Sequence, residues 1–403
     1  MTLLTPAVRA QARALRDDEL PCYLYDLAAL REHASSVRAA LPGPVELYYA
    51  AKANAEPAIL RELAPFTDGF EVSSGGELAH VRRAVPRSPL AFGGPGKTPS
   101  EIAAALRAGV ERFHVESLHE LRLLTRAAAE RRGTRGPRPR VLLRLNLPVD
   151  AQALTGSALA MGGGAAPFGM DPSEAGDAWK LLSGDAADHL EPAGLHVHLA
   201  SGLSAEAQLA LTEEILGRVT ALAGRHGLPL REVTVGGGMA VDYTRPFERF
   251  DWTAFGAGLA RAARRHPGPV LRIEPGRALT AYCGWYATEV LDVKRSRGED
   301  FAIVRGGTHH LRTPVTKGHD QPAEVLPMDD WPHPPPRPAV RGDRVTVAGQ
   351  LCTPKDVLSR GLVAPGLRAG DRVVFALAGA YAWNISHHDF LMHPRPGFRF
   401  LTP

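Results

Sequence analysis

The chain has 403 residues, of which 44% are hydrophobic and 22% are charged, and its formal net charge is +4. These proportions are ordinary for a globular protein, and the length allows two domains or one barrel with an appendage. The one dense basic run, Arg131–Arg140, is broken by Gly and Pro and has no aromatic residue to stack on bases, so we expect no nucleic-acid partner. No stretch reaches the roughly 18 apolar residues that a membrane span requires.

Cysteine usage and the N-terminus bear on the compartment. Cys22, Cys283 and Cys352 are too few for a disulfide framework, which fits a reducing environment. Residues 1–14 lack the apolar core and the small-residue cleavage site of a signal peptide. We therefore expect a soluble cytoplasmic protein without a membrane partner.

Short β-like runs alternate with amphipathic helical stretches over most of the chain. The predicted strands are Glu46–Lys52, Gly69–Val72, Leu90–Gly94, Arg112–Glu116, Arg140–Asn146, Gly194–Ala200, Val233–Gly238 and Val270–Glu274. The predicted helices include Glu56–Leu63, Gly75–Val85, Pro99–Ala108, Leu118–Arg131, Pro172–Leu182, Ala205–His226 and Trp252–Arg265. Three of these helices follow a residue suited to cap them, namely Ser74, Thr98 and Ser117. Eight βα units predict an α/β fold with a (β/α)8, TIM-like barrel, whose chemistry lies where the strands end.

The rhythm changes after about residue 275, where helical stretches become scarce and strand-like runs dominate. We expect a mostly-β C-terminal domain, of the Greek-key or β-sandwich kind, over 276–403. Residues 27–275 then form the barrel, and residues 1–26 contribute to the β domain. The Gly-rich stretch Asp150–Gly169 follows the fifth strand and is either a cover over the site or an ordinary loop.

Lys52 lies near the end of the first predicted barrel strand, Glu46–Lys52. Only six of the 47 basic residues are Lys, and the rest are Arg. A lysine at this position therefore indicates that an amine is required there, and not only a positive charge. Burying an unpaired ammonium is costly. Two interpretations follow: a nucleophilic amine whose pKa is lowered by burial, or a lysine whose head group reaches water at the end of the strand.

Polar groups also follow the last three predicted strands. Gly236, Gly237 and Gly238 after the seventh strand and Arg277 after the eighth offer bare backbone N–H groups and a guanidinium, which together indicate a phosphorylated ligand. His196 and His198 are two residues apart and so face the same side of the sixth strand. They form either a metal pair or one packed histidine and one ligand contact. Few carboxylates are available as further ligands, so we expect no metal.

Lys52, His198, the glycine run, Glu274 and Arg277 together describe a holder for pyridoxal 5'-phosphate. The lysine binds the cofactor covalently, the histidine stacks on its ring, and the glycines and arginine hold its phosphate. Glu274 faces the pyridine nitrogen and keeps it protonated, which makes the ring an electron sink suited to decarboxylation.

The chain resembles the ornithine/diaminopimelate/arginine decarboxylase family, pyridoxal phosphate enzymes with the alanine-racemase-like fold. The motifs that carry this resemblance are Tyr49–Asn54, Glu71–Glu77, His198–Ser201, Gly236–Gly238, Glu274–Arg277, Cys352–Asp356 and Gly379–Tyr381. The resemblance implies that Ser201 and Tyr381 also contact the phosphate. It further implies that Cys352, supplied by the partner subunit, protonates the product carbanion, so that the enzyme is a homodimer with two shared active sites.

The chain departs from the family where relatives bind the far end of the substrate. Thr353 replaces the acidic residue that follows the cysteine in relatives with cationic substrates. His309, His310 and Arg312 suit an anionic or hydroxy-acid end, and Asn384 lies in a second divergent segment. Both segments resemble the siderophore-biosynthesis branch, in which a citrate-linked diaminopropionate is decarboxylated. His387 and His388 are either part of this site or ordinary loop residues.

The main functional hypothesis is therefore a pyridoxal phosphate-dependent carboxy-lyase acting on an amino acid or on a side-chain-conjugated amino acid. The alternative within the family is diaminopimelate decarboxylase, with Arg312 binding the distal carboxylate. Racemisation is disfavoured because racemases of this fold have an arginine in the place of Glu274. An inactive regulatory paralogue and a metal hydrolase are the alternatives from other classes.

Overall fold

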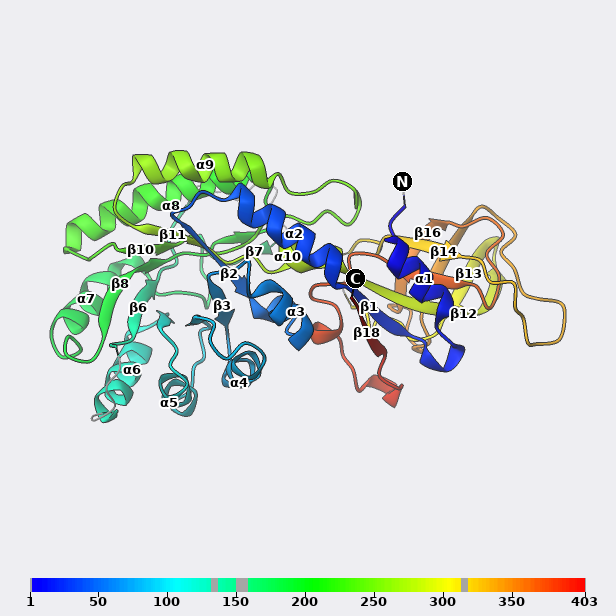
Figure 1. Cartoon of the computed structure of the whole chain (residues 1–403), viewed down its shortest axis with the longest axis horizontal. Helices are drawn as coiled ribbons and strands as arrows, with labels where there is room; N and C mark the ends of the chain where they lie inside the picture. Colours follow the sequence, from blue (N-terminus) through cyan, green and yellow to red (C-terminus); the bar gives the residue numbers. More distant parts are fainter. Residues whose placement is uncertain (1, 132–136, 150–158, 313–317, 403) are drawn as a thin grey trace. The chain divides into compact units, whose positions relative to one another are not determined.

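The computed structural model describes residues 2–131, 137–149, 159–312 and 318–402. The chain divides into two compact units (Figure 1). One unit comprises His33–Ala240 and Phe250–Leu279, and the other comprises Met1–Glu32, Val241–Arg249 and Thr280–Pro403. Part of the Gly-rich stretch Asp150–Gly169, suggested above as a cover, lies outside the described residues. No helix in the described part of the chain combines the length and apolar character needed to cross a bilayer.

The first unit is built on a closed barrel of eight parallel strands. Around the barrel they are β2 (Val45–Ala50), β3 (Gly69–Val72), β4 (Leu90–Phe92), β5 (Arg112–Val115), β6 (Arg140–Arg144), β8 (Glu191–His196), β10 (Glu232–Thr234) and β11 (Val270–Ile273). All eight predicted strands are present, which confirms the barrel. Most of them end earlier than predicted, so that Lys52, His198 and Glu274 stand just beyond the strands, in the turns that follow.

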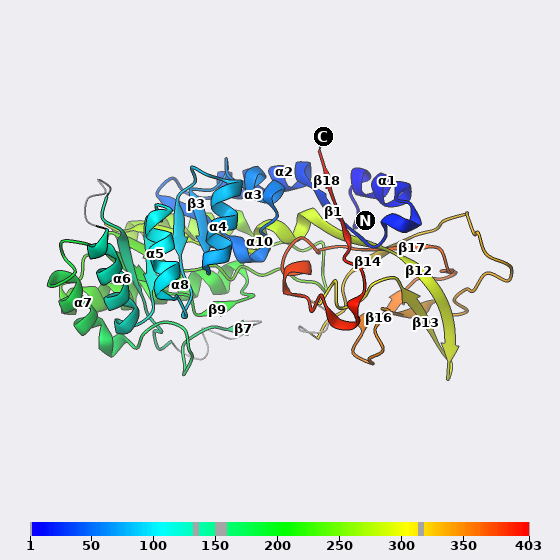
Figure 2. The same cartoon turned by 90° about the horizontal axis from the view of Figure 1, so that it is seen from below.

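Helices surround these strands. They are α2 (Leu27–Ala40), α3 (Pro57–Leu63), α4 (Gly75–Ala84), α5 (Pro99–Arg107), α6 (Leu118–Glu130), α7 (Ala175–Ser183), α8 (Ala205–His226), α9 (Trp252–Arg265) and the short α10 (Arg277–Thr280). Helices α3 to α6 lie side by side outside the strands (Figures 1 and 2). The predicted caps are confirmed, because Ser74, Thr98 and Ser117 each accept a hydrogen bond from the backbone N–H three residues later. Each cap contributes about 1 kcal/mol to its helix.

The second unit is organised around an eight-stranded sheet. Its strands are β1 (Cys22–Asp26), β12 (Gly284–Ser296), β13 (Glu299–Val304), β14 (Ala323–Leu326), β15 (Arg344–Ala348), β16 (Val357–Val363), β17 (Arg372–Phe375) and β18 (Gly397–Leu401). β1 pairs antiparallel with β12 and parallel with β18. The sheet therefore combines strands from both ends of the sequence.

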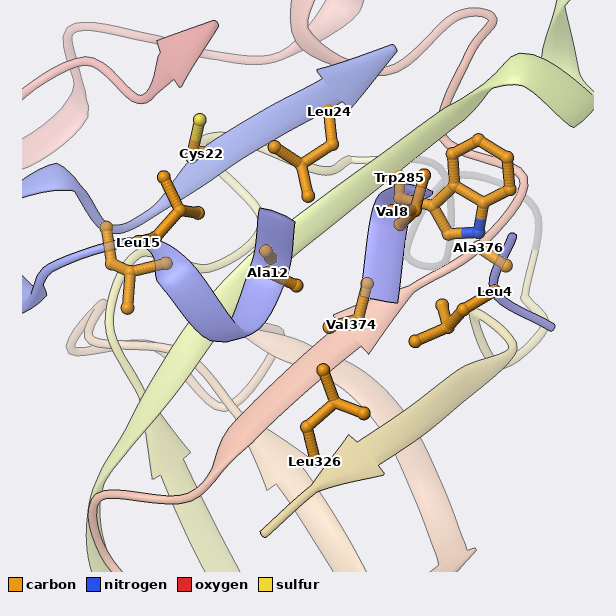
Figure 3. Packing of buried hydrophobic residues seen from close by; sticks show 12 residues of the cluster. Leu4, Val8, Ala12, Leu15, Cys22, Leu24, Trp285, Leu326, Val374 and Ala376 are labelled. Atoms are coloured by element: carbon orange, nitrogen blue, oxygen red, sulfur yellow. The ribbon is translucent and has the colours of Figure 1, made fainter. Parts of the chain in front are cut away.

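The core of this unit joins the N-terminal helix α1 (Pro6–Ala14) to the sheet. Val8 and Ala12 of the helix pack against Leu24, Trp285 and Val374 of three strands, and all five are buried (Figure 3). Trp285 donates its indole N–H to the carbonyl of Leu3 at 2.9 Å, which satisfies the one polar atom of a buried ring.

Candidate active site

Lys52 occupies a short 3-10 turn, η2 (Ala51–Ala53), directly after strand β2. Its Nζ lies 2.7 Å from Oε2 of Glu71, and its side chain is 48% exposed. The prediction that the strand includes Lys52 is therefore wrong, and so is the idea that burial desolvates the amine. The head group reaches the surface of its unit and is paired with a carboxylate. An accessible, oriented amine remains open to a carbonyl ligand.

Glu71, on the neighbouring strand β3, holds the amine of Lys52 in place. Its carboxylate is buried and also accepts a hydrogen bond from Ser73 Oγ at 2.9 Å. Burial raises the pKa of Glu71, but the ammonium of Lys52 and the Ser73 hydroxyl outweigh burial and lower it. An anionic Glu71 therefore stabilises the charged lysine and fixes its direction.

Glu274 is buried immediately after strand β11, where its backbone N–H donates to the carbonyl of Gly236 at 2.8 Å. Its Oε2 lies 3.1 Å from Nε2 of His196, and its Oε1 lies 3.6 Å from Nε2 of His114. Burial raises the pKa of Glu274, and the nearby His114 opposes this shift. Burial lowers the pKa of both imidazoles well below its usual value, so both are neutral near pH 7.

The run Gly236–Gly238 after strand β10 passes too close to its neighbours to carry side chains. A Cβ on Gly236 would lie 2.3 Å from Nδ1 of His198, and one on Gly237 would lie 2.3 Å from the carbonyl oxygen of Glu274. Gly236 and Gly238 also have positive φ angles, of 71° and 98°. The backbone is thereby left bare, as a phosphate-binding loop requires.

Two predicted phosphate contacts adjoin this loop. Ser201 lies in the short strand β9 (Ala200–Ser201), and the following residue, Gly202, donates its N–H to the carbonyl of Gly238 at 2.7 Å. Arg277 begins helix α10, three residues after Glu274. The glycine loop, Ser201, Glu274 and Arg277 therefore belong to the turns after neighbouring strands, at one end of the barrel.

His198 is partly exposed beside the glycine loop. Burial, together with the positive charges of Arg144 and Lys52, lowers the pKa of His198 to about 3. Its ring is therefore neutral near pH 7 and suited to stacking. Arg144, the last residue of strand β6, pairs through Nη1 with Oε1 of Glu116 at 2.7 Å and brings a fixed cation to this end of the barrel.

One group of side chains is close enough to hold a metal ion within the described part of the chain: His114, His196 and Glu274, whose ligand atoms lie within 4.8 Å of one another. His198 is not in this group, so the His196–His198 pair considered from the sequence does not form it. The same barrel end fits pyridoxal phosphate. Oε1 of the buried Glu274 has no hydrogen-bond partner among the described residues, and the glycine loop packs so closely on its neighbours that it has no room for a Cβ.

The predicted substrate residues belong to the second unit. Cys352 is exposed and Thr353 is partly buried, in a loop that Asp356 joins to the segment beginning at Gly306. The carboxylate of Asp356 accepts hydrogen bonds from the backbone N–H groups of Thr308 at 2.6 Å and Leu351 at 2.7 Å. The buried carboxylate of Asp356 therefore connects these two loops, and it is not available to compensate a substrate ammonium.

His309 and His310 are both buried, but their ring nitrogens differ in their partners. His310 contacts the hydroxyl of Tyr286 at 2.9 Å through Nδ1 and the carbonyl of Pro394 at 3.0 Å through Nε2, which fits a packing role. Neither ring nitrogen of His309 has a hydrogen-bond partner among the described residues. Burial lowers the pKa of His309 to about 4, so its ring is a neutral hydrogen-bonding group near pH 7.

Ser386 brings the remaining substrate candidates together. Arg312 donates its backbone N–H to Ser386 Oγ at 3.2 Å, and Ser386 donates to the carbonyl of His310 at 2.9 Å. Asn384 is exposed in the adjoining turn η6 (Trp383–Ile385). Tyr381 lies in the same segment with a φ of 48°, which is uncommon for a bulky residue. The cofactor candidates other than Tyr381 thus lie in one unit, and the substrate candidates lie in the other.

Three residues without a role predicted from the sequence also lie at the barrel end, namely Glu71, His114 and Arg144. Each is a polar residue within the carboxyl-terminal part of an otherwise buried barrel strand. That pattern was the available signal, because polar side chains at these positions face the active end of a barrel.

A closed parallel barrel with an ion-paired lysine, a bare glycine loop and a buried carboxylate at one end is the architecture of a pyridoxal phosphate enzyme. The chain belongs to the family of pyridoxal-dependent decarboxylases, whose pyridoxal-binding domain model matches residues 27–281. This match confirms the predicted family and cofactor, and the protein is a pyridoxal phosphate-dependent decarboxylase.

Two curated relatives and one solved structure show how far the similarity extends. The 2-[(L-alanin-3-ylcarbamoyl)methyl]-2-hydroxybutanedioate decarboxylase of Staphylococcus aureus is 36% identical over 383 residues, with 94% of each chain covered. A diaminopimelate decarboxylase of Pseudomonas aeruginosa is 33% identical over 373 residues, covering 91% of this chain and 84% of the relative. The diaminopimelate decarboxylase of Helicobacter pylori, complexed with L-lysine, superposes with a TM-score of 0.82 at 25% identity, covering 98% of this chain and 93% of that one.

Proposed function

We propose that this enzyme removes the α-carboxylate of a diaminopropionate unit joined through its side-chain nitrogen to citrate. The name of the S. aureus relative describes such a conjugate: an alanin-3-yl group carried by a carbamoylmethyl arm on hydroxybutanedioate. The similarity over 94% of both chains is the observation that carries the proposal. It agrees with the siderophore-biosynthesis branch suggested by the sequence.

The local chemistry of the second unit supports an anionic distal group. Thr353 presents a neutral hydroxyl, which cannot compensate a buried ammonium, so a free diamine end is disfavoured. Arg312 is exposed and can donate to carboxylates, and the buried ring of His309 has no hydrogen-bond partner at either nitrogen among the described residues. His310 and Asn384 complete the proposed substrate set, although the contacts of His310 fit a supporting role better.

Each cofactor residue has a proposed task. Pyridoxal phosphate, when bound, withdraws electrons from the substrate Cα and so makes the loss of CO₂ feasible. Lys52 attaches the cofactor, and Glu274 holds a proton at the ring nitrogen. His198 packs on the ring face and excludes water from it. The phosphate is bound by Gly236, Gly237, Gly238, Ser201, Arg277 and Tyr381.

Cys352 is the proposed donor that returns a proton to Cα after CO₂ has left. By the family resemblance it acts on the site of the partner subunit, so we infer a homodimer with two shared active sites. The exposure of Cys352 on its unit supports this inference, since a group that serves another subunit must lie at a surface. Free thiols at Cys22, Cys283 and Cys352 support a reducing, cytoplasmic location.

A CO₂-release screen tests the substrate. The holoenzyme is offered the citrate–diaminopropionate conjugate, free diaminopropionate, diaminopimelate and ornithine, and we expect the conjugate to give the highest kcat/KM. If diaminopimelate is turned over best, the proposed substrate is wrong.

A substitution at Arg312 locates the specificity. The Arg312→Ala variant should lose about 10- to 150-fold in kcat/KM for the conjugate, because a charge-assisted hydrogen bond contributes roughly 1.5–3 kcal/mol. Its cofactor absorbance should be unchanged. Arg360→Ala, which removes another exposed arginine of the same unit, is the matched control. An equal loss in both variants would mean that Arg312 has no specific role.

A second candidate substrate is diaminopimelate, which is favoured by the 33% identity to the P. aeruginosa enzyme and by the guanidinium of Arg312 as a partner for a distal carboxylate. The same screen separates the two. Cofactor binding without CO₂ release from any compound would instead favour the inactive regulatory paralogue.

A further inference from the structure

Two buried histidines flank the carboxylate of Glu274, and the proposed function assigns them no task. His114 comes from strand β5, and His196 is the last residue of β8. Their side chains are only 1% and 5% exposed. Nε2 of His196 lies 3.1 Å from Oε2 of Glu274, and Nε2 of His114 lies 3.6 Å from Oε1. Each imidazole thus faces its own oxygen of the one carboxylate.

The two rings also support each other by stacking. Their centroids are 4.2 Å apart and their planes differ by 29°. The Nε2 atoms face different oxygens of Glu274, which fits a carboxylate held by two side chains. His114, His196 and Glu274 come from β5, from β8 and from the turn after β11, so they meet only when these strands close into the barrel.

Three buried polar atoms of this cluster lack hydrogen-bond partners among the described residues. They are Oε1 of Glu274, Nε2 of His114 and Nδ1 of His196. Buried polar atoms without partners are uncommon, because each costs free energy comparable to a lost hydrogen bond. An acceptor at Oε1 is therefore available to a donor such as a protonated ring nitrogen.

We propose that His114 and His196 are positioning residues that clamp the carboxylate of Glu274, so that Oε1 points at the ring nitrogen of the bound cofactor. This inference rests on the proposed role of Glu274. Neither histidine is assigned a contact with substrate or cofactor. Partners behind a directly binding group fix its orientation and raise its effectiveness, as they do around metal ligands.

The electrostatic surroundings favour neutral imidazoles in this role. Burial lowers the pKa of His114 and His196, and the positive charges of Lys97, Arg144 and Arg272 act in the same direction. A neutral His196 donates one hydrogen bond to the carboxylate, and a neutral His114 packs beside Oε1 at 3.6 Å. Neither ring then adds a cation that would compete with a protonated cofactor ring.

The test compares two cofactors in each variant. Dissociation constants are measured on the apoenzyme for pyridoxal phosphate and for its 1-deaza analogue, in which C–H replaces the ring nitrogen. The dissociation constant of the 1-deaza analogue divided by that of pyridoxal phosphate measures how much the ring nitrogen contributes to binding. We expect the ratio to fall by about tenfold or more in His196→Leu and His114→Leu, and to recover partly in His196→Gln, whose amide N–H keeps a donor.

A matched control removes a buried hydrogen bond elsewhere in the barrel. Tyr48 accepts a hydrogen bond from Arg112 Nη1 at 2.8 Å, near the amino-terminal end of the barrel strands. Tyr48→Phe should leave the ratio unchanged even if it lowers stability. Glu274→Gln should abolish the preference for pyridoxal phosphate; if it does not, the proposed role of Glu274 fails.

The remaining outcomes decide the inference itself. If Glu274→Gln abolishes the preference but His196→Leu and His114→Leu weaken both cofactors equally, the histidines are only structural and the inference is overturned. Stoichiometric Zn²⁺ binding by the apoenzyme that is lost in all three variants would also overturn it, in favour of a metal centre.

Discussion

Gly236 offers a sharp test of the glycine cradle, because the structure predicts a cost for a single added methyl group. A Cβ at this position would lie 2.3 Å from Nδ1 and 2.7 Å from Cγ of His198, and the backbone φ is 71°. A non-glycine residue in the left-handed region costs about 1–2 kcal/mol. Forcing an extra methyl into a packed site adds roughly 1–3 kcal/mol. The Gly236→Ala substitution should therefore cost about 2–5 kcal/mol in total.

Most of this cost should appear in cofactor binding, because the proposed functions of the loop and of His198 both lie there. A loss of 2 kcal/mol corresponds to about a 30-fold weaker dissociation constant. The assay is a titration of the apoenzyme with pyridoxal phosphate, paired with thermal unfolding of the apoenzyme. Gly217→Ala is the control: Gly217 is exposed within helix α8, and a Cβ there meets nothing within 4 Å. That change should stabilise the protein by about 0.4–1 kcal/mol.

A Gly236→Ala variant that binds the cofactor as tightly as the wild type would contradict a role of the glycine loop in cofactor binding. A variant with normal affinity and lower thermal stability would show that the close approach of Gly236 to His198 serves folding alone.

Three further predictions follow from the described contacts. Equimolar Lys52→Ala and Cys352→Ala, after subunit exchange, should recover about a quarter of wild-type activity if sites are shared in a symmetric dimer, and no recovery would contradict sharing. Maleimide should label Cys352 first, because Cys352 is exposed, whereas burial raises the pKa of Cys22 to about 11 and also raises that of Cys283. Peptide mass spectrometry locates the label, and early labelling of Cys22 would contradict the structure. Burial lowers the pKa of His310 to about 3, so its contribution to stability is complete above about pH 6.5 and is lost as the pH falls towards 3. The free energy of unfolding is measured in urea between pH 7.5 and 5.5. As the pH falls, it should decrease in His310→Gln by up to about 1.4 kcal/mol less per pH unit than in the wild type, and an equal pH dependence in the two proteins would refute this.

The secondary structure of the barrel could be predicted because its signals are local. Capping by Ser74, Thr98 and Ser117 involves atoms within three residues, and each strand is a short, mostly buried run. The strand ends were less predictable. Apolar and small residues continue past Ala50, whereas the chain turns there to bring Lys52 to Glu71, a contact between neighbouring strands.

The discontinuous second unit had no such local signal. Val241–Arg249 lies within the barrel sequence but belongs to this unit. Tyr243 stacks on His319 with ring centroids 4.3 Å apart, and Arg249 lies 4.5 Å from the ring centre of Tyr282. Such contacts depend on partners far along the chain, which periodicity does not reveal.

The sequence by itself determined the alternating βα order and the choice of chemistry, because the lysine, the glycine run and the Glu-Pro-Gly-Arg motif are each short stretches with a recognisable purpose. Only the tertiary structure decided what surrounds them. Glu71 reaches Lys52, and His114 and His196 reach Glu274, because parallel strands closed into a barrel place their carboxyl ends around one rim. Residues widely separated in sequence become neighbours there through register and closure, and neither is encoded in any single stretch.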